Sequence, residues 1–464
     1  MKIETNIYLQ SFGAAETVTG SKHLLITPEL NILIDCGLFQ GIKSLREENW
    51  TVPGFDPKAV DVVILTHAHL DHCGYLPLLF KNGYKGKVYM SGPTKDLAEI
   101  ILLDSAKIQE EDAERANEMG YSKHHPAKPL YTTADVEHIF PYFFVLETEA
   151  IHQLSKHISF QFFTAGHIPG ACSVQINCYE KSIVFSGDIG RYRSELLLSP
   201  VHPAHADFII MESTYGDRLH DNTPIDVELA GLINETIYQR GNILIPCFAV
   251  GRAQDVIHIL YNLKKQKQIP TSVPVFLDSP MAAAASKVLG RYPEWLTISV
   301  KECAQMFSSV TINQDHQNTR RIIAQKESKI ILAASGMMTG GRVLEYLKHY
   351  LTNSKNTILI IGFQAEGTRG RTLLNHAHEL KIYGEYFSVK ARIVEIDSLS
   401  AHADQAELVR WLKEFKTIKP RVFLVHGEPS AQQALRVKIK DEFDLPATIV
   451  KKGERLLLFS LEKE

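Results

Sequence analysis

The stretch Thr66-His67-Ala68-His69-Leu70-Asp71-His72 places three histidines and an aspartate within six consecutive positions. It follows the apolar run Val62-Val63-Ile64-Leu65, which predicts a buried strand, and it leads into a helix predicted over 71–81. Imidazole nitrogens and carboxylate oxygens are ligands of zinc and similar divalent ions. A single histidine in a loop is usually solvated, but a crowd of such groups behind a buried strand costs stability unless something pairs them. The stretch therefore predicts a metal site.

The bulk composition sets limits on the class of protein. A chain of 464 residues favours two domains, and 45% hydrophobic with 22% charged residues is ordinary for a globular protein. The formal net charge of −3 excludes a globally basic surface. A nucleic-acid partner would therefore need a local basic groove.

The cysteines and the N-terminus indicate the compartment. The six cysteines form no Cys-x-x-Cys pair, so the sequence predicts neither a zinc knuckle nor a disulfide scaffold. Residues 1–5 lack the apolar core of a signal peptide, and no apolar run is long enough to span a bilayer. We therefore expect a cytoplasmic protein with reduced thiols and no membrane partner.

The pattern of predicted elements changes near residue 208. The earlier part is rich in short strands around a helix predicted over 93–119, which indicates packed sheets with helices outside. After it, strands and helices alternate, which predicts parallel strands with helical crossovers and hence a doubly wound α/β domain. A closing hairpin is predicted around Lys452-Gly453.

Five further polar residues come directly after apolar strands. Strand ends that point the same way are where mixed α/β folds collect their chemistry. Each residue alone has an ordinary alternative, such as a turn cap, a surface acid or a hydrogen-bonded core histidine. Their shared placement favours metal binding, because the histidine-rich stretch lacks enough ligands for two ions. The residues are Asp35, His167, Asp188, Glu212 and His426.

One set of these residues resembles the metallo-β-lactamase fold in its two-metal hydrolase form, namely Asp35, His67-x-His69-x-Asp71-His72, His167 and Asp188. Glu212-Ser213-Thr214-Tyr215-Gly216, Ser400-Ala401-His402-Ala403-Asp404 and Val425-His426-Gly427-Glu428 further resemble motifs A, B and C of the β-CASP nucleases. Residues 246–252 and 335–341 also match that group. The resemblance covers nearly the whole chain. It implies an α/β protein with an αββα sandwich over 1–210 and 393–464 and an inserted doubly wound β-CASP domain over 211–392.

The resemblance also implies a ligand set for two divalent ions. Zinc is the expected ion, although manganese or iron suits the same donors. Asp35 would orient the histidine-rich loop from outside the coordination sphere. One ion would be held by His67, His69, His167 and Asp188, and the other by Asp71, His72, Asp188 and His426.

The implied reaction is hydrolysis of phosphodiester bonds in single-stranded RNA. Paired divalent ions lower the pKa of a shared water and clamp the phosphodiester for in-line attack. Asp71, Glu212 and His402 would be the catalytic residues, with Glu212 orienting His402 toward the scissile phosphate or the leaving oxygen. A histidine at position 426 is, in this group, typical of enzymes that act on RNA.

Two glycine-containing loops are candidates for binding RNA phosphates. Exposed amides at helix N-termini bind anions, and arginines beside them would add charge. The alternative is that these glycines simply make turns. The candidate residues are Ser335, Gly336, Thr339, Gly340, Gly341, Arg342, Gly367, Arg369 and Arg371.

Two rival functions remain open at this point. The first is a small-molecule hydrolase such as a thioesterase, against which the long insertion and the His402 segment argue. The second is a metal-free RNA-binding scaffold, against which the filled ligand positions argue. Dimerisation through the C-terminal part follows by analogy alone, and the sequence does not distinguish endonuclease from exonuclease activity.

Overall fold

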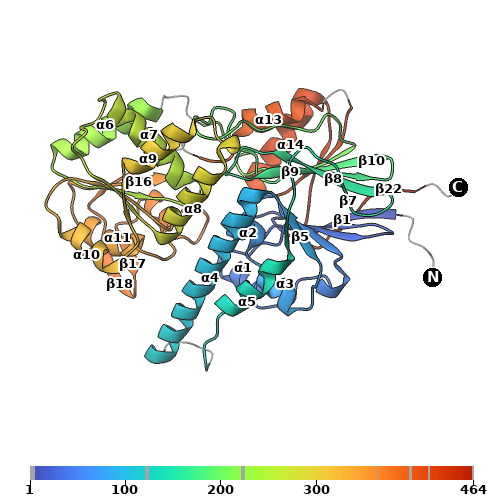
Figure 1. Cartoon of the computed structure of the whole chain (residues 1–464), viewed down its shortest axis with the longest axis horizontal. Coiled ribbons are helices and arrows are strands. Elements are labelled where there is room, and N and C mark those ends of the chain that lie inside the picture. The colour runs from blue at the N-terminus through green and yellow to red at the C-terminus, as the bar shows by residue number, and fades with distance from the viewer. Residues whose placement is uncertain are drawn as a thin grey trace. The chain divides into compact units, whose positions relative to one another are not determined.

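The computed structural model describes residues 6–120, 125–220, 225–362, 364–396, 400–415 and 418–461. The chain forms two compact units, coloured along the sequence in Figure 1. The first unit comprises Met1–Ser194, Leu198–Leu219 and His402–Glu464, and the second comprises Glu195–Leu197 and His220–Ala401. The functional domain boundaries at 210/211 and 392/393 stay a prediction.

The first unit contains two seven-stranded sheets. In the first sheet the strand order is β22 (Arg455–Ser460), β1 (Asn6–Gly13), β2 (Lys22–Ile26), β3 (Asn31–Ile34), β4 (Val62–Ile64), β5 (Lys87–Met90) and β6 (Phe143–Val145). In the second sheet it is β21 (Ala447–Ile449), β20 (Arg421–Leu424), β11 (Phe208–Met211), β10 (Lys181–Phe185), β9 (Cys172–Cys178), β8 (Ile158–Thr164) and β7 (His152–Gln153). Strands β3 to β6 are mutually parallel, and so are β10, β11, β20 and β21.

Aromatic rings join the two sheets face to face. Tyr89 of β5 lies 5.7 Å from Phe160 of β8, and Phe208 of β11 stacks on Phe459 of β22 with ring centroids 5.6 Å apart. The helices α13 (Gln405–Lys413) and α14 (Pro429–Phe443) cover the outer face of the second sheet through an apolar cluster that includes Trp411. Figure 1 shows α3 (Leu76–Lys81), α4 (Gly92–Met119) and α5 (Thr133–Ile139) beyond the first sheet. This layering confirms the predicted αββα sandwich.

Helix ends follow the sequence signals where those signals are local. The long helix α4 begins at a cap in which Ser91 Oγ accepts the Thr94 N–H, and it ends at Gly120 with φ 64°. The single helix predicted over 71–81 is wrong, because α2 (Leu70–Cys73) and α3 are separate. Pro77 explains the break, since proline has no N–H to continue a helix but is tolerated in a first turn.

The hairpin predicted around Lys452-Gly453 is also wrong. Strand β21 pairs with β20 in the second sheet, whereas β22 pairs with β1 in the first. The turn therefore carries the chain from one sheet to the other. Each strand pairs with a strand of a different sheet and forms the new edge of that sheet.

The second unit is a doubly wound α/β domain. Its six-stranded parallel sheet has the order β14 (Thr311–Asn313), β13 (Val275–Asp278), β15 (Ile330–Ala333), β12 (Ile243–Pro246), β16 (Thr357–Ile361) and β19 (Arg392–Ile396). A separate hairpin consists of β17 (Glu379–Ile382) and β18 (Glu385–Ser388).

Alternating strand residues feed two cores in this unit. Ile243 and Ile245 of β12 pack on one side with α6 (Ile225–Tyr238), α7 (Arg252–Lys265), α8 (Pro280–Arg291) and α9 (Val300–Ser308). Leu244 packs on the other side with α10 (His316–Ala324), α11 (Val343–Tyr350) and α12 (Arg369–Leu374). Strands buried on both faces read as continuous apolar runs, which is why the sequence predicted this domain correctly.

Candidate metal centre

Neighbouring strands of the first unit bring its polar residues to one edge of each sheet. Strands β3 and β4 run parallel with Ile34 opposite Ile64, so Asp35 and the stretch 66–72 emerge together. Strands β10, β11 and β20 are parallel in the second sheet, and they end just before Asp188, Glu212 and His426. His167 lies in the turn between β8 and β9. Residues far apart in sequence are thus placed close together.

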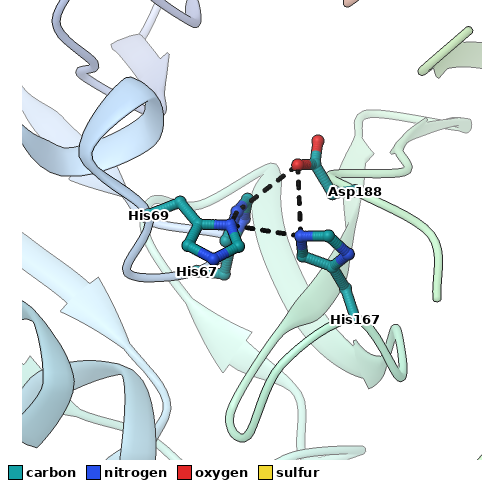
Figure 2. Close-up of side chains that lie close together, drawn as sticks. All are labelled: His67, His69, His167 and Asp188. Carbon is teal, nitrogen blue, oxygen red and sulfur yellow. Dashed lines mark hydrogen bonds and ion pairs between the residues drawn. The ribbon is translucent and has the colours of Figure 1, made fainter. Parts of the chain in front are cut away.

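The first group of potential ligands consists of three imidazoles and one carboxylate. The Nδ1 atom of His69 lies 3.1 Å from Nε2 of His67 and 3.1 Å from Nε2 of His167. Both Nε2 atoms lie 3.5 Å from Oδ2 of Asp188. Figure 2 shows the four side chains, with the imidazoles gathered beside one oxygen of the Asp188 carboxylate. His67 and His167 are buried.

The second group uses the other oxygen of the same carboxylate. The Oδ1 atom of Asp188 lies 3.3 Å from Nε2 of His72 and 3.7 Å from Nε2 of His426. These two nitrogens are 3.2 Å apart, and Oδ2 of Asp71 lies 3.5 Å from the His426 nitrogen and 3.9 Å from the His72 nitrogen. Asp188 therefore faces both groups, one oxygen to each.

The spacing of these atoms suits metal coordination. Four ligands about 2.0–2.2 Å from one ion in a tetrahedron lie about 3.3–3.6 Å apart. The separations given above run from 3.1 to 3.9 Å. The buried Oδ1 atom of Asp188 has no hydrogen-bond partner among the described residues. A buried carboxylate oxygen without a donor is costly, and a cation between it and the imidazoles would remove that cost.

Hydrogen bonds fix the second ring nitrogen of three histidines. Thr66 Oγ1 lies 3.1 Å from Nδ1 of His67, and Asp35 Oδ2 lies 2.7 Å from Nδ1 of His72. Thr214 Oγ1 lies 3.0 Å from Nδ1 of His426. In each case Nε2 is left to face the site. Such partners hold a ring in the orientation and tautomer that a metal ligand needs.

Asp35 also holds the start of the histidine-rich loop. Its Oδ1 atom accepts hydrogen bonds from the backbone N–H of Thr66 at 2.8 Å and from the Thr66 hydroxyl at 3.0 Å. Close backbone packing holds the other end of the loop, because a Cβ on Gly37 would lie only 1.6 Å from the carbonyl oxygen of Asp71. Glycine is therefore required at position 37.

Two site residues have strained backbones. Asp35 has φ 60° and His426 has φ 49°, a left-handed conformation that non-glycine residues rarely adopt. The His426 N–H donates to the carbonyl of Ala14 at 2.7 Å, and the Asp35 N–H donates to that of Ile64 at 3.0 Å. Strain of this kind persists only where surrounding contacts enforce it, and it clusters at functional sites.

The electrostatic environment prepares the histidines as ligands. Burial lowers the pKa of His67 well below its ordinary value and that of His69 to about 4, so both rings stay neutral at pH 7. Burial also lowers the pKa of His72, but neighbouring carboxylates, Asp188 and Asp35 foremost, outweigh it and raise that pKa well above the ordinary value. These carboxylates attract positive charge, which a proton or a metal ion can supply.

His402 stands beside the two groups with its own carboxylate partner. Its Nδ1 atom lies 3.2 Å from Oε2 of Glu212 and 4.0 Å from Oδ2 of Asp188. Glu212 is buried and its Oε1 atom accepts the N–H of Ile189 at 2.6 Å. Residue 402 forms a β-bridge with Gly190, two residues after Asp188. The acid and the imidazole are thus held in a fixed relation.

Family models match most of the chain. The Metallo-beta-lactamase superfamily matches residues 21–227, the Beta-Casp domain matches 253–373, and the Zn-dependent metallo-hydrolase RNA specificity domain matches 386–450. Ribonuclease TTHA0252 of Thermus thermophilus is 36% identical over 434 residues, which cover 91% of this chain and 94% of that protein.

The chain belongs to the β-CASP family of metallo-β-lactamase-fold proteins. An RNase J-like protein of Methanocaldococcus jannaschii is 30% identical and covers 96% of this chain and 99% of its own length. The transcription termination factor FttA of the same organism is 31% identical, and the match covers 91% of this chain and 67% of that protein.

A solved structure also matches nearly the whole chain. The crystal structure of a protein of unknown function from Enterococcus faecalis V583 has a TM-score of 0.54 at 13% identity, covering 98% of this chain and all of that one. At this identity the likeness shows a shared fold and nothing more. In the described part of the chain, no helix is long and apolar enough to cross a membrane.

The nine residues expected to bind RNA phosphates lie in the second unit, in and near loops that follow β15 and β16. All three arginines make contacts within the unit. Arg342 pairs with buried Asp278 at 2.5 Å, and Arg371 pairs with Glu366 at 2.8 Å. Arg369 donates to the carbonyls of residues 338, 339 and 381.

The other members of that set shape the loop itself. The Thr339 N–H donates to Ser335 Oγ at 3.1 Å, and a Cβ on Gly336 would lie 2.8 Å from the ring of Phe248. Gly341 and Gly367 have φ of 79° and 78°, and the φ value explains glycine at both positions. A Cβ on Gly340 would meet open space. RNA binding by these loops stays a prediction.

Sequence reasoning missed two residues that orient ligands. Thr66 and Thr214 lie inside the motifs described above, but those motifs predict no role for either residue. Thr66 directly precedes the histidine cluster, and that position was the available signal. For Thr214 the contact with His426 joins residues 212 positions apart, so no local pattern could have predicted it.

Proposed function

We propose that this protein is a binuclear metal-dependent ribonuclease that hydrolyses phosphodiester bonds of single-stranded RNA. The observation that carries the proposal is that the two carboxylate oxygens of Asp188 face different ligand groups. Oδ2 faces His67 and His167, and Oδ1 faces His72 and His426. A carboxylate shared in this way is the expected bridge between two ions. The names of the similar ribonuclease and RNase J-like proteins support RNA as the substrate.

Seven residues would hold the ions, with zinc the favoured metal in view of the zinc-dependent domain that matches residues 386–450. When bound, paired divalent ions supply a hydroxide near neutral pH and stabilise the negative charge that develops on the phosphate. The first ion would be held by His67, His69, His167 and Asp188, and the second by Asp71, His72, His426 and Asp188.

His402 would supply the proton for the leaving oxygen. A protonated imidazole carries an N–H on both nitrogens, so one can bind a carboxylate while the other donates. With Nδ1 at 3.2 Å from Glu212, Nε2 is the atom for proton transfer. Glu212 would act as a positioning residue that also favours the charged form of the ring.

Two other assignments remain with this proposal. We assign the second unit to RNA binding through its loops after β15 and β16, and we retain a homodimer formed through the C-terminal region as a prediction. The shared ligand set serves both internal cleavage and degradation from a 5′ end, so either mode is consistent with the proposed reaction.

Digestion of single-stranded RNA labelled at the 5′ end or at the 3′ end, with and without a chelator, tests the proposal. We expect cleavage that the chelator abolishes and added zinc or manganese restores. The two labels distinguish internal cuts from stepwise removal of 5′ nucleotides. Metal analysis of the same preparation should give about two ions per chain.

The rival functions predict different results. A small-molecule hydrolase on the same fold would cleave a thioester and leave the RNA intact. A non-catalytic scaffold would bind RNA without cleaving it and would contain no metal. Either result would contradict the proposed ribonuclease activity.

A further inference from the structure

A cavity of about 370 Å³ opens in the first unit, and none of the potential metal ligands described above is among its lining residues. Its volume lies at the lower end of ordinary small-molecule pockets, which measure about 300–1,000 Å³. It is bounded by the end of β1, the start of β2, the loop that follows α1 (Lys43–Glu48) and the turn before β22. The lining residues on which its chemistry depends are Phe12, Lys22, Phe39, Glu48, Tyr75 and Lys452.

Lys22 places a buried ammonium group at this cavity. The residue is 2% exposed, and its Nζ atom lies 4.5 Å from the ring centre of Phe39 and 4.8 Å from that of Tyr75. Among the described residues it donates a hydrogen bond to the carbonyl of Gly20 at 3.2 Å. An ammonium has three N–H donors, so Lys22 has donors to spare in a place where leaving them unused is costly.

The protonated form of Lys22 is nevertheless the main form at neutral pH. Burial lowers its pKa to about 8, which still leaves most of the population charged at pH 7. The two aromatic faces compensate part of the lost hydration through cation–π attraction. The cavity therefore presents a poorly hydrated positive charge.

A second ammonium faces the same ring from a more exposed position. Lys452 Nζ lies 5.0 Å from the ring centre of Phe39 and forms an ion pair with Glu48. Its side chain is 42% exposed. Two ammonium groups and one carboxylate leave the cavity with an excess of positive charge, which selects an anion.

The other polar groups of the wall are already engaged. The side chain of Asn49 accepts from the N–H and donates to the carbonyl of Phe39, and the Tyr75 hydroxyl donates to the carbonyl of Thr51. Gln10 donates to the carbonyl of Gly453 at 2.8 Å. Selection by the cavity thus depends on charge and shape more than on a pattern of hydrogen bonds.

Apolar side chains make up much of the remaining wall. Phe12, Val52 and Pro53 line it, and Trp50 on the adjoining loop is 61% exposed. An isolated phosphate would fill a small part of the volume. Aromatic side chains combined with lysines are the usual means of binding a base together with its phosphate. We propose that this cavity binds one nucleotide, with its phosphate on the ammonium of Lys22 and its base against the apolar wall.

The loop between β1 and β2 connects this cavity to the candidate metal centre. Ser21, next to Lys22, donates its N–H to the carbonyl of Asp71 at 2.8 Å, and the carbonyl of Ala14 accepts the N–H of His426 at 2.7 Å. The cavity is therefore linked to the candidate metal centre through backbone hydrogen bonds of this loop. The assignment of the nucleotide to a bound RNA strand rests on the proposed ribonuclease function, and a free mononucleotide is the other source of the same chemistry.

Calorimetric titration of the metal-loaded protein tests the proposal. The probes are AMP, UMP, adenosine, inorganic phosphate and a short phosphorothioate-linked single-stranded RNA that resists hydrolysis. Lys22→Met should weaken AMP binding by roughly tenfold or more, because a hydrogen-bonded charge is lost. Lys452→Met should weaken it less. Lys107→Met, at a lysine 71% exposed on α4, is the matched control and should change nothing.

The probes separate the possible outcomes. Similar affinities of the wild type for AMP and UMP support recognition by charge and stacking. If Lys22→Met lowers the affinity for RNA together with that for AMP, the nucleotide bound in the cavity belongs to an RNA strand. If Lys22→Met lowers the affinity for AMP but leaves the affinity for RNA unchanged, the ligand of the cavity is a free mononucleotide. Equal AMP binding by wild type and Lys22→Met, or inorganic phosphate binding as tightly as AMP, would overturn the proposal.

Two safeguards keep the test decisive. Thermal melting establishes that Lys22→Met is folded, and Lys452→Met tests the same cavity from its exposed side if it is not. The titrations measure binding without cleavage. A failed ribonuclease assay would therefore leave AMP binding intact, and the two hypotheses fail separately.

Discussion

Nδ1 of His402 lies 3.2 Å from Oε2 of Glu212, and this contact joins residues 190 positions apart at the edge of the candidate metal centre. Burial alone would lower the pKa of His402. The Glu212 carboxylate outweighs it, with smaller contributions from Asp188 and Asp71, and the pKa of His402 is raised above its ordinary value. His402 can therefore hold a proton near neutral pH.

Replacing His402 by alanine should remove catalysis and leave metal binding intact. Loss of a general acid typically slows a reaction by about 10²–10⁴-fold. Metal content per chain and the RNA cleavage rate would be measured on the same preparation, with His138→Ala, at an exposed position of α5, as the control. If His402→Ala lost metal in proportion to activity, His402 would be a ligand and its role as acid would be wrong.

Glu212→Gln keeps the shape of the side chain and removes its charge. The pKa of His402 should then fall, because the carboxylate that raises it most is lost. An acid must be protonated to act, so the alkaline decline of the rate should begin at a lower pH than in wild type. Profiles of kcat/KM against pH measure the shift. If the alkaline decline of kcat/KM were the same in Glu212→Gln and wild type, the protonation of His402 would not control the rate.

Asp188→Asn should weaken both ligand groups, whereas His67→Ala should weaken one. Wild type is expected to hold about two ions per chain, His67→Ala about one, and Asp188→Asn less than one. Elemental analysis after dialysis measures the ratio, and Asp441→Asn, at an exposed position of α14, is the control. Chelation should also lower the melting temperature of wild type more than that of Asp188→Asn. Equal metal content in the two site variants would contradict a bridging role.

Sequence patterns predicted those parts of the fold and site that depend on neighbours along the chain. The histidine-rich stretch 66–72, the strands before it and the capped helix 92–119 carry their own signals. Asp188 and His426 became candidates only because each follows an apolar strand, and their convergence depends on strand order across the second sheet. Long-range pairing also explains the wrongly predicted hairpin at 452–453, since β21 and β22 join different sheets.

Lys22 illustrates a second limit of sequence reasoning. A lysine in sequence predicts exposure, because burying an ammonium is usually unfavourable. Here the ring faces of Phe39 and Tyr75 lie beside it, and neither residue is near Lys22 in the sequence. The arginines of the second unit show a related limit, although RNA binding by their loops stays a prediction. They were expected to face RNA, yet the guanidinium of Arg342 is paired with the buried carboxylate of Asp278.

The stability of the first unit should fall in mild acid because of His23. Burial lowers its pKa from 6.5 to about 3, and its ring lies between Ser11 Oγ at 2.8 Å and Ser21 Oγ at 3.1 Å. The unfolded chain therefore binds a proton that the folded chain excludes. This contribution is fully present above pH 6.5 and is lost as the pH falls toward 3.

The expected size is roughly 2 kcal/mol between pH 6.5 and pH 5, since one proton corresponds to about 1.4 kcal/mol per pH unit. Urea unfolding of wild type and His23→Gln at the two pH values measures it, because glutamine keeps a hydrogen-bonding side chain without titrating. The stability difference between the two proteins should shift in favour of the variant at pH 5. If the stability difference between the two proteins were independent of pH, folding would not lower the pKa of His23.

Arg342 and Arg371 were both predicted to bind RNA, and their surroundings predict different effects of substitution. Asp278 is fully buried and also accepts hydrogen bonds from Asn313, Thr319 and Tyr346. Arg342→Gln would leave this carboxylate without its cation, and loss of one partner of a buried pair costs about 3–5 kcal/mol. The three remaining donors should reduce that cost, so we expect the free energy of unfolding in urea to fall by about 2–4 kcal/mol.

Arg371→Gln breaks a pair with half-exposed Glu366 and should lower the free energy of unfolding by about 1 kcal/mol or less. If Arg342→Gln left stability unchanged and weakened RNA binding alone, its guanidinium would be a substrate contact and the structural role argued for it would be wrong.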